Sequence, residues 1–464
     1  MYQVQLNQPV HIHFIGIGGI SMSGLAEILL DRGFTVTGSD MHESALTKHL
    51  EKKGATIFFP QAKENVVDGI DVVVYTAAIH EDNPEYLEVK RQGLPMLTRA
   101  ELLGELMRNY KEAINIAGTH GKTTTTSMVS EILLEAGVDP TITIGGVLDD
   151  IGGNVHAGKQ DYIVVEACEY TNSFLSFYPT VSVLLNVEAD HLDFFKDLDD
   201  VRHSFREFAK KTSKDGAVVI NQDIDHYEYF IEGLSQKVIT FGNDGTADYY
   251  AKNIRFDELA CGTFDVYEKG NLLGEVTLCV PGNHNISNAL AAIATCRYFD
   301  IPFNVIADGL KRYRGTERRF EYKGVVNGFT IIDDYAHHPQ EIDASIQTAL
   351  AYPHKKLWVA FQSHTYTRTA ALLDEFAESL SKADVVIVAD IYAAREENTI
   401  GISGQDIVDK IKQYNENAFY IPTFKEIEDY AIKNVQEGDL FVTMGAGDIN
   451  LVGEHLIEEY GEKQ

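Results

Sequence analysis

Residues 116–127, IAGTHGKTTTTS, have the residue types and spacing of a loop that binds phosphate. They follow the apolar run Glu112-Ala-Ile-Asn-Ile and contain Gly-x-x-Gly-Lys-Thr, which indicates a strand that turns through glycine into a helix. Backbone N–H groups at such a turn and the positive end of the helix surround phosphate oxygens. Lys122 can reach the outer phosphates, and the Thr123 hydroxyl can bind Mg²⁺. The pattern predicts that the chain binds a nucleoside triphosphate.

This loop departs from the strict phosphate-loop pattern at one position. Ile116 stands where the first glycine belongs, and the nearest upstream glycine is Gly118. The alternative interpretation is a tight turn that only caps an ordinary helix. Gly, Lys and Thr side by side at a strand–helix junction favour phosphate binding. The residues predicted to bind the nucleotide here are Gly118, Thr119, His120, Gly121, Lys122, Thr123 and Thr124.

Two later strand ends offer ligands for the Mg²⁺ that a bound triphosphate requires. Glu166 ends the apolar segment 161–167, with Glu169 just beyond it, and the segment 181–187 is followed by Glu188-Ala-Asp-His191. The carboxyl ends of parallel strands meet at one edge of a sheet, where the loop also lies. Glu166 is therefore predicted to bind a metal ion and His191 a second one. Asp190 and Asp193 either join them or only cap the following helix.

A second glycine turn occurs near the N-terminus. Gly16-Ile-Gly18-Gly19 follows an apolar strand, and Asp40 ends the next strand, but Ser21 stands where a strict dinucleotide motif has its third glycine. The turn could bind NAD or the pyrophosphate of another nucleotide, because the same kind of helix N-terminus holds either ligand. Asp40 could hold ribose hydroxyls in both cases. A third interpretation is that the glycines only allow close packing of helix and strand.

The surrounding elements predict an α/β fold with three domains. Strands and helices alternate along residues 1–108, which indicates a Rossmann-like domain with a parallel, doubly wound sheet. Residues 109–315 form a central domain of the phosphate-loop ATPase type with a mostly parallel sheet, although 237–281 is expected to consist of short antiparallel strands. Residues 316–464 form a second Rossmann-like domain that opens with a hairpin at Asn327-Gly328. Predicted strands of the last two domains are 161–167, 181–187, 216–221, 357–362, 385–391 and 440–447.

Composition excludes several classes of partner. The formal net charge of −31 and the absence of a basic run argue against nucleic acid and anionic membrane. No apolar run of about 18 residues and no secretory signal is visible. The four cysteines are widely spaced, which fits a reducing cytoplasm without a structural zinc. We expect a cytoplasmic enzyme that acts on small molecules, as a monomer or homodimer.

The segment Pro281-Gly-Asn-His-Asn285-Ile-Ser-Asn288 opens a predicted helix over 285–298. Asn285 and Asn288 are three residues apart and therefore share a helical face. Side-chain amides can both donate to and accept from an adenine edge. An ordinary helix N-terminus explains the segment equally well.

Taken together, these segments resemble the Mur ligase family, the ATP-dependent enzymes that add amino acids to the peptidoglycan precursor. The resemblance extends along the whole chain, and the matching segments are HFIGIGGISMSGLAEILLDRG, GSD, TAAIHEDNPE, LTRAELLGELMR, INIAGTHGKTTTTSM, VVEACEYTNSFL, LLNVEADHLDFF, PGNHNISNALAA, ERRFE, IIDDYAHHPQEI, FQSHTYTRT and MGAGDI. It is strongest for the branch that joins L-alanine to UDP-N-acetylmuramic acid.

The resemblance implies a mechanism and residue roles. ATP would phosphorylate the lactyl carboxylate of the nucleotide sugar, and the amine of L-alanine would attack the resulting acyl phosphate. Two Mg²⁺ ions are expected. The roles implied are catalysis by Lys122, His191, Tyr335, His337 and Arg368, metal binding by Thr123, Glu166 and His191, ATP binding by Asn285, Asn288 and Arg319 besides the loop, and UDP-substrate binding by Gly18, Gly19, Ile20, Ser39, Asp40 and Thr76. Closure of the outer domains before chemistry is also expected.

The chain also differs from the family pattern. Phe205 lies near the position of a lysine that several members carbamylate to hold the second metal, so His191, the substrate and water would have to suffice. Thr365 stands where many members have arginine, which leaves Arg368 with less help in binding a carboxylate, and Ser363 replaces a usual proline. Three alternatives stay open: a related ligase that attaches a preformed tripeptide to the same nucleotide, an NAD-dependent dehydrogenase, and a non-catalytic sensor of ATP and nucleotide sugar.

Overall fold

The computed structural model describes residues 2–76, 78–191, 194–394 and 396–461 of the chain. It is a three-domain α/β protein with three separate sheets, as predicted from the sequence. The chain groups into two compact units, one of residues 1–250, 267–271 and 288–309, the other of 251–266, 272–287 and 310–464. No helix in the described part of the chain has the length and apolar character needed to cross a membrane.

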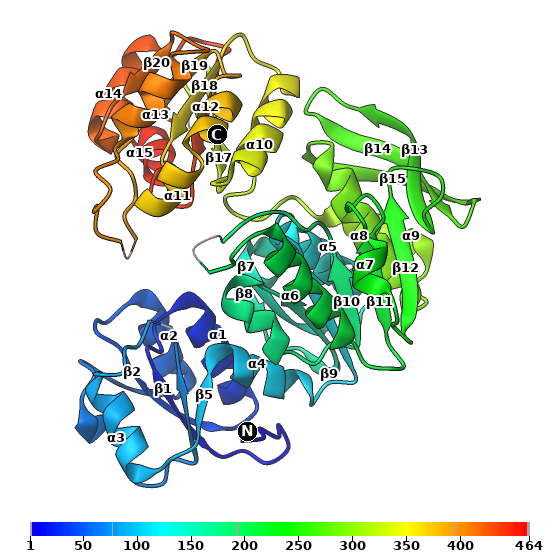
Figure 1. Cartoon of the computed structure of the whole chain (residues 1–464), viewed down its shortest axis with the longest axis vertical. Helices are drawn as coiled ribbons and strands as arrows, with labels where there is room; N and C mark the ends of the chain where they lie inside the picture. The colour runs from blue at the N-terminus through cyan, green and yellow to red at the C-terminus, as the bar shows by residue number, and fades with distance from the viewer. Residues whose placement is uncertain (1, 77, 192–193, 395, 462–464) are drawn as a thin grey trace. The chain divides into compact units, whose positions relative to one another are not determined.

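The N-terminal sheet has five parallel strands in the order β3-β2-β1-β4-β5, drawn in blue to cyan in Figure 1. Because β1 lies between β2 and β4, the strand order reverses there, and ligands of such sheets bind at the carboxyl ends of these strands. The strands are β1 (His11–Ile15), β2 (Thr35–Ser39), β3 (Thr56–Phe58), β4 (Val72–Tyr75) and β5 (Met96–Thr98), and the helices are α1 (Ile20–Asp31), α2 (Ala45–Lys53), η1 (Lys63–Asn65), α3 (Pro84–Gln92) and α4 (Arg99–Met107).

Local sequence explains the limits of these helices. Ser44 caps α2 through a reciprocal pair of hydrogen bonds with Thr47, and Gly54 ends the helix with a φ of +108°. Asn83 caps α3 ahead of Pro84, and Gly93 ends that helix with a φ of +70°. The alternation predicted for residues 1–108 is therefore confirmed.

The central sheet has ten strands in the order β15-β14-β13-β12-β11-β10-β6-β9-β7-β8. Strand β6, which leads into the predicted phosphate loop, pairs in parallel with β9 and β10. The strands are β6 (Glu112–Ala117), β7 (Pro140–Leu148), β8 (Gly153–His156), β9 (Lys159–Glu166), β10 (Val181–Leu184), β11 (Ala217–Asn221), β12 (Lys237–Gly242), β13 (Tyr249–Phe256), β14 (Cys261–Glu268) and β15 (Asn271–Pro281). The helices are α5 (Lys122–Glu135), η2 (Asp149–Ile151), η3 (Tyr170–Ser176), α6 (Leu198–Lys210), α7 (Glu228–Ile231), α8 (His284–Tyr298) and α9 (Phe303–Arg312).

One expectation about this sheet was wrong, and two of its strands were missed. The segment 237–281 does not consist of antiparallel strands throughout, because β12 pairs in parallel with β11 and with β13. The connection from β11 to β12 contains α7, which lets the chain cross over and return in the same direction. Strands β7 and β8 were not predicted, although the alternation Thr-Ile-Thr-Ile inside β7 is typical of a strand.

The C-terminal sheet has six strands in the order β16-β17-β21-β18-β19-β20, parallel except for the β16–β17 hairpin. Asn327 and Gly328 form its turn with φ of +48° and +81°, as the Asn-Gly pair predicts. The strands are β16 (Glu321–Val326), β17 (Phe329–Asp334), β18 (Leu357–Phe361), β19 (Val385–Val388), β20 (Ala418–Tyr420) and β21 (Leu440–Met444). The helices are α10 (Pro339–Ala351), α11 (Tyr366–Ala371), α12 (Leu373–Leu380), α13 (Gly404–Ile411), α14 (Phe424–Asn434) and α15 (Asn450–Tyr460).

Both faces of this sheet are buried. In β18, Leu357, Val359 and Phe361 pack into one core, and Trp358 and Ala360 pack into the other. Successive side chains of a strand point to opposite faces, so a strand covered on both faces is apolar throughout.

Candidate active site

The predicted phosphate loop joins the end of β6 to the start of α5. Gly121 has a φ of +80°, a left-handed conformation that glycine adopts without strain, and Lys122 begins the helix. A Cβ atom at Gly121 would lie 2.5 Å from Oδ1 of Asn288, so any larger residue would displace that amide. The close approach brings Asn288, predicted to bind adenine, beside the loop.

The loop is held by the segment that follows β10. The backbone N–H of His120 donates to Oδ1 of Asn186 at 2.7 Å, and the backbone N–H of Glu188 donates to the Thr119 hydroxyl at 2.9 Å. The His120 ring lies 3.1 Å from the Glu188 carboxylate. Because these contacts fix the loop from a neighbouring strand end, its shape does not depend on α5 alone.

Lys122 folds back over its own loop. Its ammonium donates to the carbonyls of Gly118 (2.5 Å) and Thr119 (3.0 Å) and to Oε1 of Glu169 (3.2 Å). Burial disfavours the charged form, but the attraction of Glu169 and of Glu166 outweighs burial and raises the pKa of Lys122. The lysine is therefore a permanent cation at the start of α5.

Thr123 and Glu166 meet beside the loop, as the positions of the strand ends predict. The Thr123 hydroxyl donates to Oε2 of Glu166 at 2.9 Å, and the Gly145 N–H donates to the same oxygen at 2.8 Å. A hydroxyl and a carboxylate at a helix N-terminus are the oxygen ligands that Mg²⁺ takes near phosphates. The donor set therefore fits Mg²⁺.

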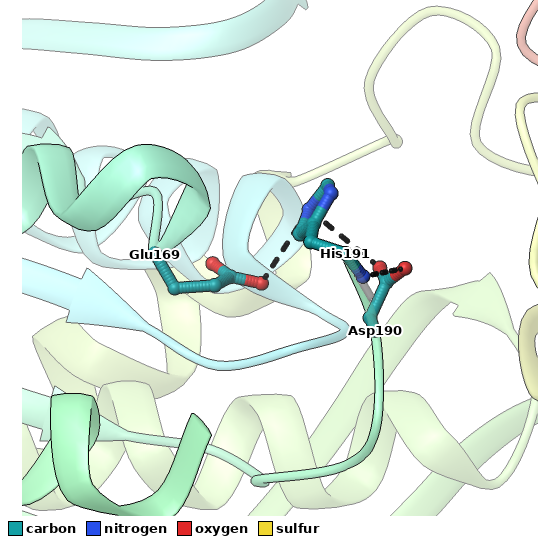
Figure 2. Close-up of side chains that lie close together, drawn as sticks. All are labelled: Glu169, Asp190 and His191. Carbon is teal, nitrogen blue, oxygen red and sulfur yellow. Dashed lines mark hydrogen bonds and ion pairs between the residues drawn. The ribbon is translucent and has the colours of Figure 1, made fainter. Parts of the chain in front are cut away.

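A second group of possible metal ligands consists of Glu169, Asp190 and His191, whose ligand atoms all lie within 4.8 Å of one another (Figure 2). The His191 Nε2 atom is 4.0 Å from Glu169 and 3.7 Å from Asp190. Asp190 also accepts a hydrogen bond from the His191 backbone at 2.6 Å, and α6 is capped by Asp197 instead. Two carboxylates and an imidazole can hold a divalent cation. Asp193 lies outside the described residues.

Sequence reasoning gave no role to Glu169, which the fold places between Lys122 and His191. The sequence shows that Glu169 lies three residues after Glu166, but it does not show toward which residues the Glu169 side chain points. The chain turns sharply at the start of η3, where Thr171 and Asn172 have φ of +55° and +57°. Phe205, by contrast, is buried edge-to-face against Phe174, with ring centroids 5.3 Å apart, and belongs to the core.

The N-terminal turn is closed by the end of β2. The N–H of Gly18 donates to Oδ2 of Asp40 at 2.7 Å, and a Cβ at Gly18 would lie 2.8 Å from that oxygen. Gly16 has a φ of +85° and packs against Thr76. Gly19 precedes the first turn of α1, where the Ile20 side chain is exposed. The structure thus gathers most predicted UDP contacts at one sheet edge.

Ser39 faces away from this turn. Its hydroxyl donates to Glu85 at 2.5 Å, and both side chains are fully buried. The same carboxylate accepts from Asn65 at 2.5 Å and lies 3.5 Å from Nε2 of His13. Burial alone would raise the pKa of Glu85, but the nearby His13 ring and the hydrogen bonds from Ser39 and Asn65 lower it overall. The backbone of Ser39, whose carbonyl accepts from Gly16 at 2.9 Å, shapes the turn.

Several of the predicted C-terminal residues also meet. The Arg319 guanidinium lies 5.2 Å from the centroid of the Tyr335 ring, and the His337 ring packs edge-to-face on the same tyrosine at 5.3 Å. His337 is oriented by the carbonyl of Tyr335 (3.0 Å) and by Glu341, which accepts from its backbone. The Tyr335 ring attracts the guanidinium, and a guanidinium held in this way can pair with an anionic group.

Arg368 lies on α11 in the same unit, beside the His364 ring, which stacks on Tyr392 with centroids 5.5 Å apart. Asn285, the other residue predicted to bind adenine, contacts its own segment, because its side-chain amide donates to the Pro281 carbonyl at 2.7 Å. Thr365 precedes α11 with a φ of +67°, which is strained for a β-branched residue. Sequence reasoning did not single out His364 or Tyr392, although His364 lies within a segment that carried the resemblance.

Comparison with known proteins agrees with this architecture. Residues 11–111 match the Mur ligase family catalytic domain, residues 116–296 the Mur ligase middle domain, and residues 318–447 the Mur ligase glutamate ligase domain. A chain with three α/β domains, a phosphate loop and acidic strand ends is thus placed among the nucleotide-dependent ligases. It belongs to the Mur ligase family.

Similar proteins narrow the comparison. The chain is 57% identical to a UDP-N-acetylmuramate–L-alanine ligase of Lachnospira eligens, over 99% of this chain and 100% of that protein. It is 50% identical to the enzyme of the same name from Caldanaerobacter subterraneus, over 98% and 99% of the two chains.

Solved structures give the same result. The UDP-N-acetylmuramate–alanine ligase of Thermotoga maritima superposes with a TM-score of 0.81 at 31% identity, over 97% of this chain and 98% of that one. A murein peptide ligase of Psychrobacter arcticus superposes with a TM-score of 0.72 at 25% identity, over 97% of this chain and 98% of that one. Similarity is therefore greater, in both sequence and fold, to the alanine ligase.

Proposed function

We propose that the chain catalyses the ATP-dependent ligation of L-alanine to the lactyl carboxylate of UDP-N-acetylmuramic acid, a step in the synthesis of the peptidoglycan precursor. The observation that carries this proposal is the 57% identity to an enzyme of that activity over essentially the whole of both chains. The phosphate loop with Lys122, Thr123 and Glu166 at its edge supplies the chemistry that such a reaction needs.

The reaction proceeds through an activated acyl group. A lactyl carboxylate oxygen attacks the γ-phosphorus of ATP, ADP leaves, and an acyl phosphate forms. The amine of L-alanine then attacks the acyl carbon, loses a proton, and inorganic phosphate leaves as the amide forms. Positioning and neutralisation of charge, rather than covalent help from the protein, lower these barriers.

Each group of residues supports one part of this sequence. Lys122 stabilises the charge of the transferred phosphoryl group, which its raised pKa permits at any physiological pH. Thr123 and Glu166 would hold one Mg²⁺, and His191 would hold a second. When bound, these ions neutralise phosphate and carboxylate charge. Asn285, Asn288 and Arg319 bind ATP.

Substrate recognition is assigned to the two outer domains. The backbone of Gly18 and Gly19, with Ile20, Ser39, Asp40 and Thr76, binds the UDP part of the nucleotide sugar. Tyr335 and His337 line the side of the amino acid, and Arg368 pairs with its carboxylate. We assign residues 1–108, 109–315 and 316–464 to the three domains with these tasks, and propose a monomer or homodimer that works in the cytoplasm.

The second candidate is a ligase that attaches a preformed tripeptide to the same nucleotide. The structural similarity to the murein peptide ligase of Psychrobacter arcticus supports this second candidate. Such an enzyme accepts a peptide amine where the first candidate accepts a free amino acid.

One assay separates these candidates. Purified protein is incubated with UDP-N-acetylmuramic acid and Mg-ATP, and phosphate release and product mass are followed with L-alanine, glycine, L-serine or an L-alanyl tripeptide. Product with L-alanine, lost in Lys122→Ala, is the expected result. Product with the tripeptide alone would favour the second candidate, and no product with any amine would contradict both.

A further inference from the structure

The Lys122 ammonium has no donor left for a phosphate in this structure. An ammonium group carries three N–H bonds. Here one points to each of the carbonyls of Gly118 and Thr119, and the third to the Glu169 carboxylate. A phosphate can therefore bind this lysine only after at least one of these contacts is broken.

The contact with Glu169 is the one that resists breaking. Both carboxylate oxygens lie near the ammonium, at 3.2 Å and 3.1 Å, and the Glu169 side chain is only 2% exposed. Removing one partner of a buried ion pair leaves the other charge without compensation, which is strongly unfavourable. The lysine can thus move to a phosphate at low cost only if another cation takes its place beside Glu169.

The surroundings of Glu169 provide for such a cation. Asp190 and His191 lie beside it, and ligand atoms of the three residues come within 4.8 Å of one another (Figure 2). Before any cation binds, the carboxylates of Glu166 and Glu169 act on Lys122, and Asp190 adds a third negative charge within 4.8 Å of Glu169. ATP, itself a polyanion, would enter against their repulsion.

We propose that Glu169 is a positioning residue that keeps Lys122 on its own loop until a divalent cation binds between Glu169, Asp190 and His191. Cation binding would neutralise Glu169, release the ammonium and let it reach the outer phosphates. The inference rests on the proposed function in taking ATP as the nucleotide. Binding of the nucleotide and binding of the cation would then depend on each other through the Glu169 side chain.

The test measures ATP binding to the full chain by calorimetry, with EDTA or with excess Mg²⁺, in the wild type and in Glu169→Gln. Glutamine keeps the shape and removes the charge, so binding in EDTA should tighten about tenfold, and Mg²⁺ should improve binding less than in the wild type. Asp161→Asn, an equal loss of charge at an exposed position of β9, is the control and should change neither value more than about twofold. Equal or weaker binding by Glu169→Gln in EDTA, with an unchanged melting temperature, would overturn the proposal.

Two further variants keep the test decisive. In a Lys122→Met background there is no ammonium to release, so Glu169→Gln should tighten binding in EDTA by only about twofold through reduced repulsion. A full tenfold gain there would show that Glu169 does not act through the lysine. If Glu169→Gln does not fold, Glu169→Asp, whose carboxylate is one methylene shorter, should tighten binding about threefold, and no gain would count against the proposal. Failure of the wild type to make product with any amine would contradict the proposed function and leave this comparison intact.

Discussion

The two glycine turns of this protein have similar backbones and different surroundings. Each follows an inner strand, β1 or β6, that pairs in parallel with both of its neighbours, and each leads into a helix N-terminus. At the first turn the Asp40 carboxylate accepts from the N–H of Gly18. At the second, Lys122 begins the helix, and Glu166 and Glu169 flank it. Backbone N–H groups suffice to hold a pyrophosphate, whereas transfer of a phosphoryl group also requires cations placed by side chains.

We therefore expect the first turn to determine substrate affinity and the second to determine turnover. Substitutions in the central domain should change kcat, and substitutions in the N-terminal domain should change KM or stability. Each of the following predictions tests one side of that comparison.

The largest effect is expected for Lys122→Ala. Loss of the cation beside the transferred phosphoryl group should lower kcat by roughly a thousandfold. The KM for UDP-N-acetylmuramic acid should change little. Steady-state kinetics against Lys111→Ala, an exposed lysine just before β6, provide the matched control. A variant that keeps kcat and loses sugar-nucleotide affinity would reverse the roles of the two turns.

Glu166→Gln should have the next largest effect. It removes the charge that meets the Thr123 hydroxyl and weakens the predicted Mg²⁺ site, so kcat should fall about a hundredfold and half-maximal activity should require more Mg²⁺. Titration of activity with Mg²⁺ checks this, with Asp161→Asn as the control on the same strand. An unchanged Mg²⁺ dependence would remove Glu166 from the metal site.

Gly18→Ala tests the first turn. The added Cβ would lie 2.8 Å from Oδ2 of Asp40 and push apart the groups predicted to hold UDP. The KM for the sugar nucleotide should rise about tenfold while kcat at saturation stays within about twofold. Gly153→Ala adds a Cβ whose nearest neighbour is 4.0 Å away and serves as the control. A fall in kcat without a change in KM would show that this turn also serves the chemistry.

The smallest effect on turnover is expected for Glu85→Gln, in the buried cluster behind the first turn. Replacing one acceptor oxygen by an amide leaves the Ser39 or Asn65 donor mismatched, which should cost about 1–3 kcal/mol of unfolding free energy. Thermal melting against Glu81→Gln, at an exposed position, measures this cost. Unaltered melting would mean that the cluster does not stabilise the domain.

The same cluster predicts a dependence on pH. Because the folded protein lowers the pKa of Glu85 below its ordinary value of 4.5, the carboxylate contributes stability above that pH and loses it as the pH falls through the folded-state pKa. The difference in stability between the wild type and Glu85→Gln should therefore shrink below pH 4.5. Denaturant titrations at neutral and acidic pH compare the two proteins, and a difference that grows on acidification would contradict the lowered pKa.

The sequence by itself determined the fold class and much of the candidate site. Alternating apolar and helical segments predicted the N-terminal and C-terminal sheets, because hydrophobic periodicity is a local property. Lys122, Thr123 and Glu166 could be named in advance, since a glycine turn and the end of a parallel strand must lie at the same sheet edge. The confirmed hairpin at Asn327-Gly328 has an equally local cause, the φ values that its turn requires.

Tertiary structure alone decided which groups touch. The direction of β12 depends on a crossover rather than on its residues. Glu169 meets Lys122 across 47 positions of sequence because β6 and β9 pair in parallel and bring their carboxyl ends to the same sheet edge. Ser39 donates to the buried Glu85 instead of facing the turn. Such contacts depend on packing between distant segments, which no local pattern encodes, and they determine whether a charge is free to react or held in place.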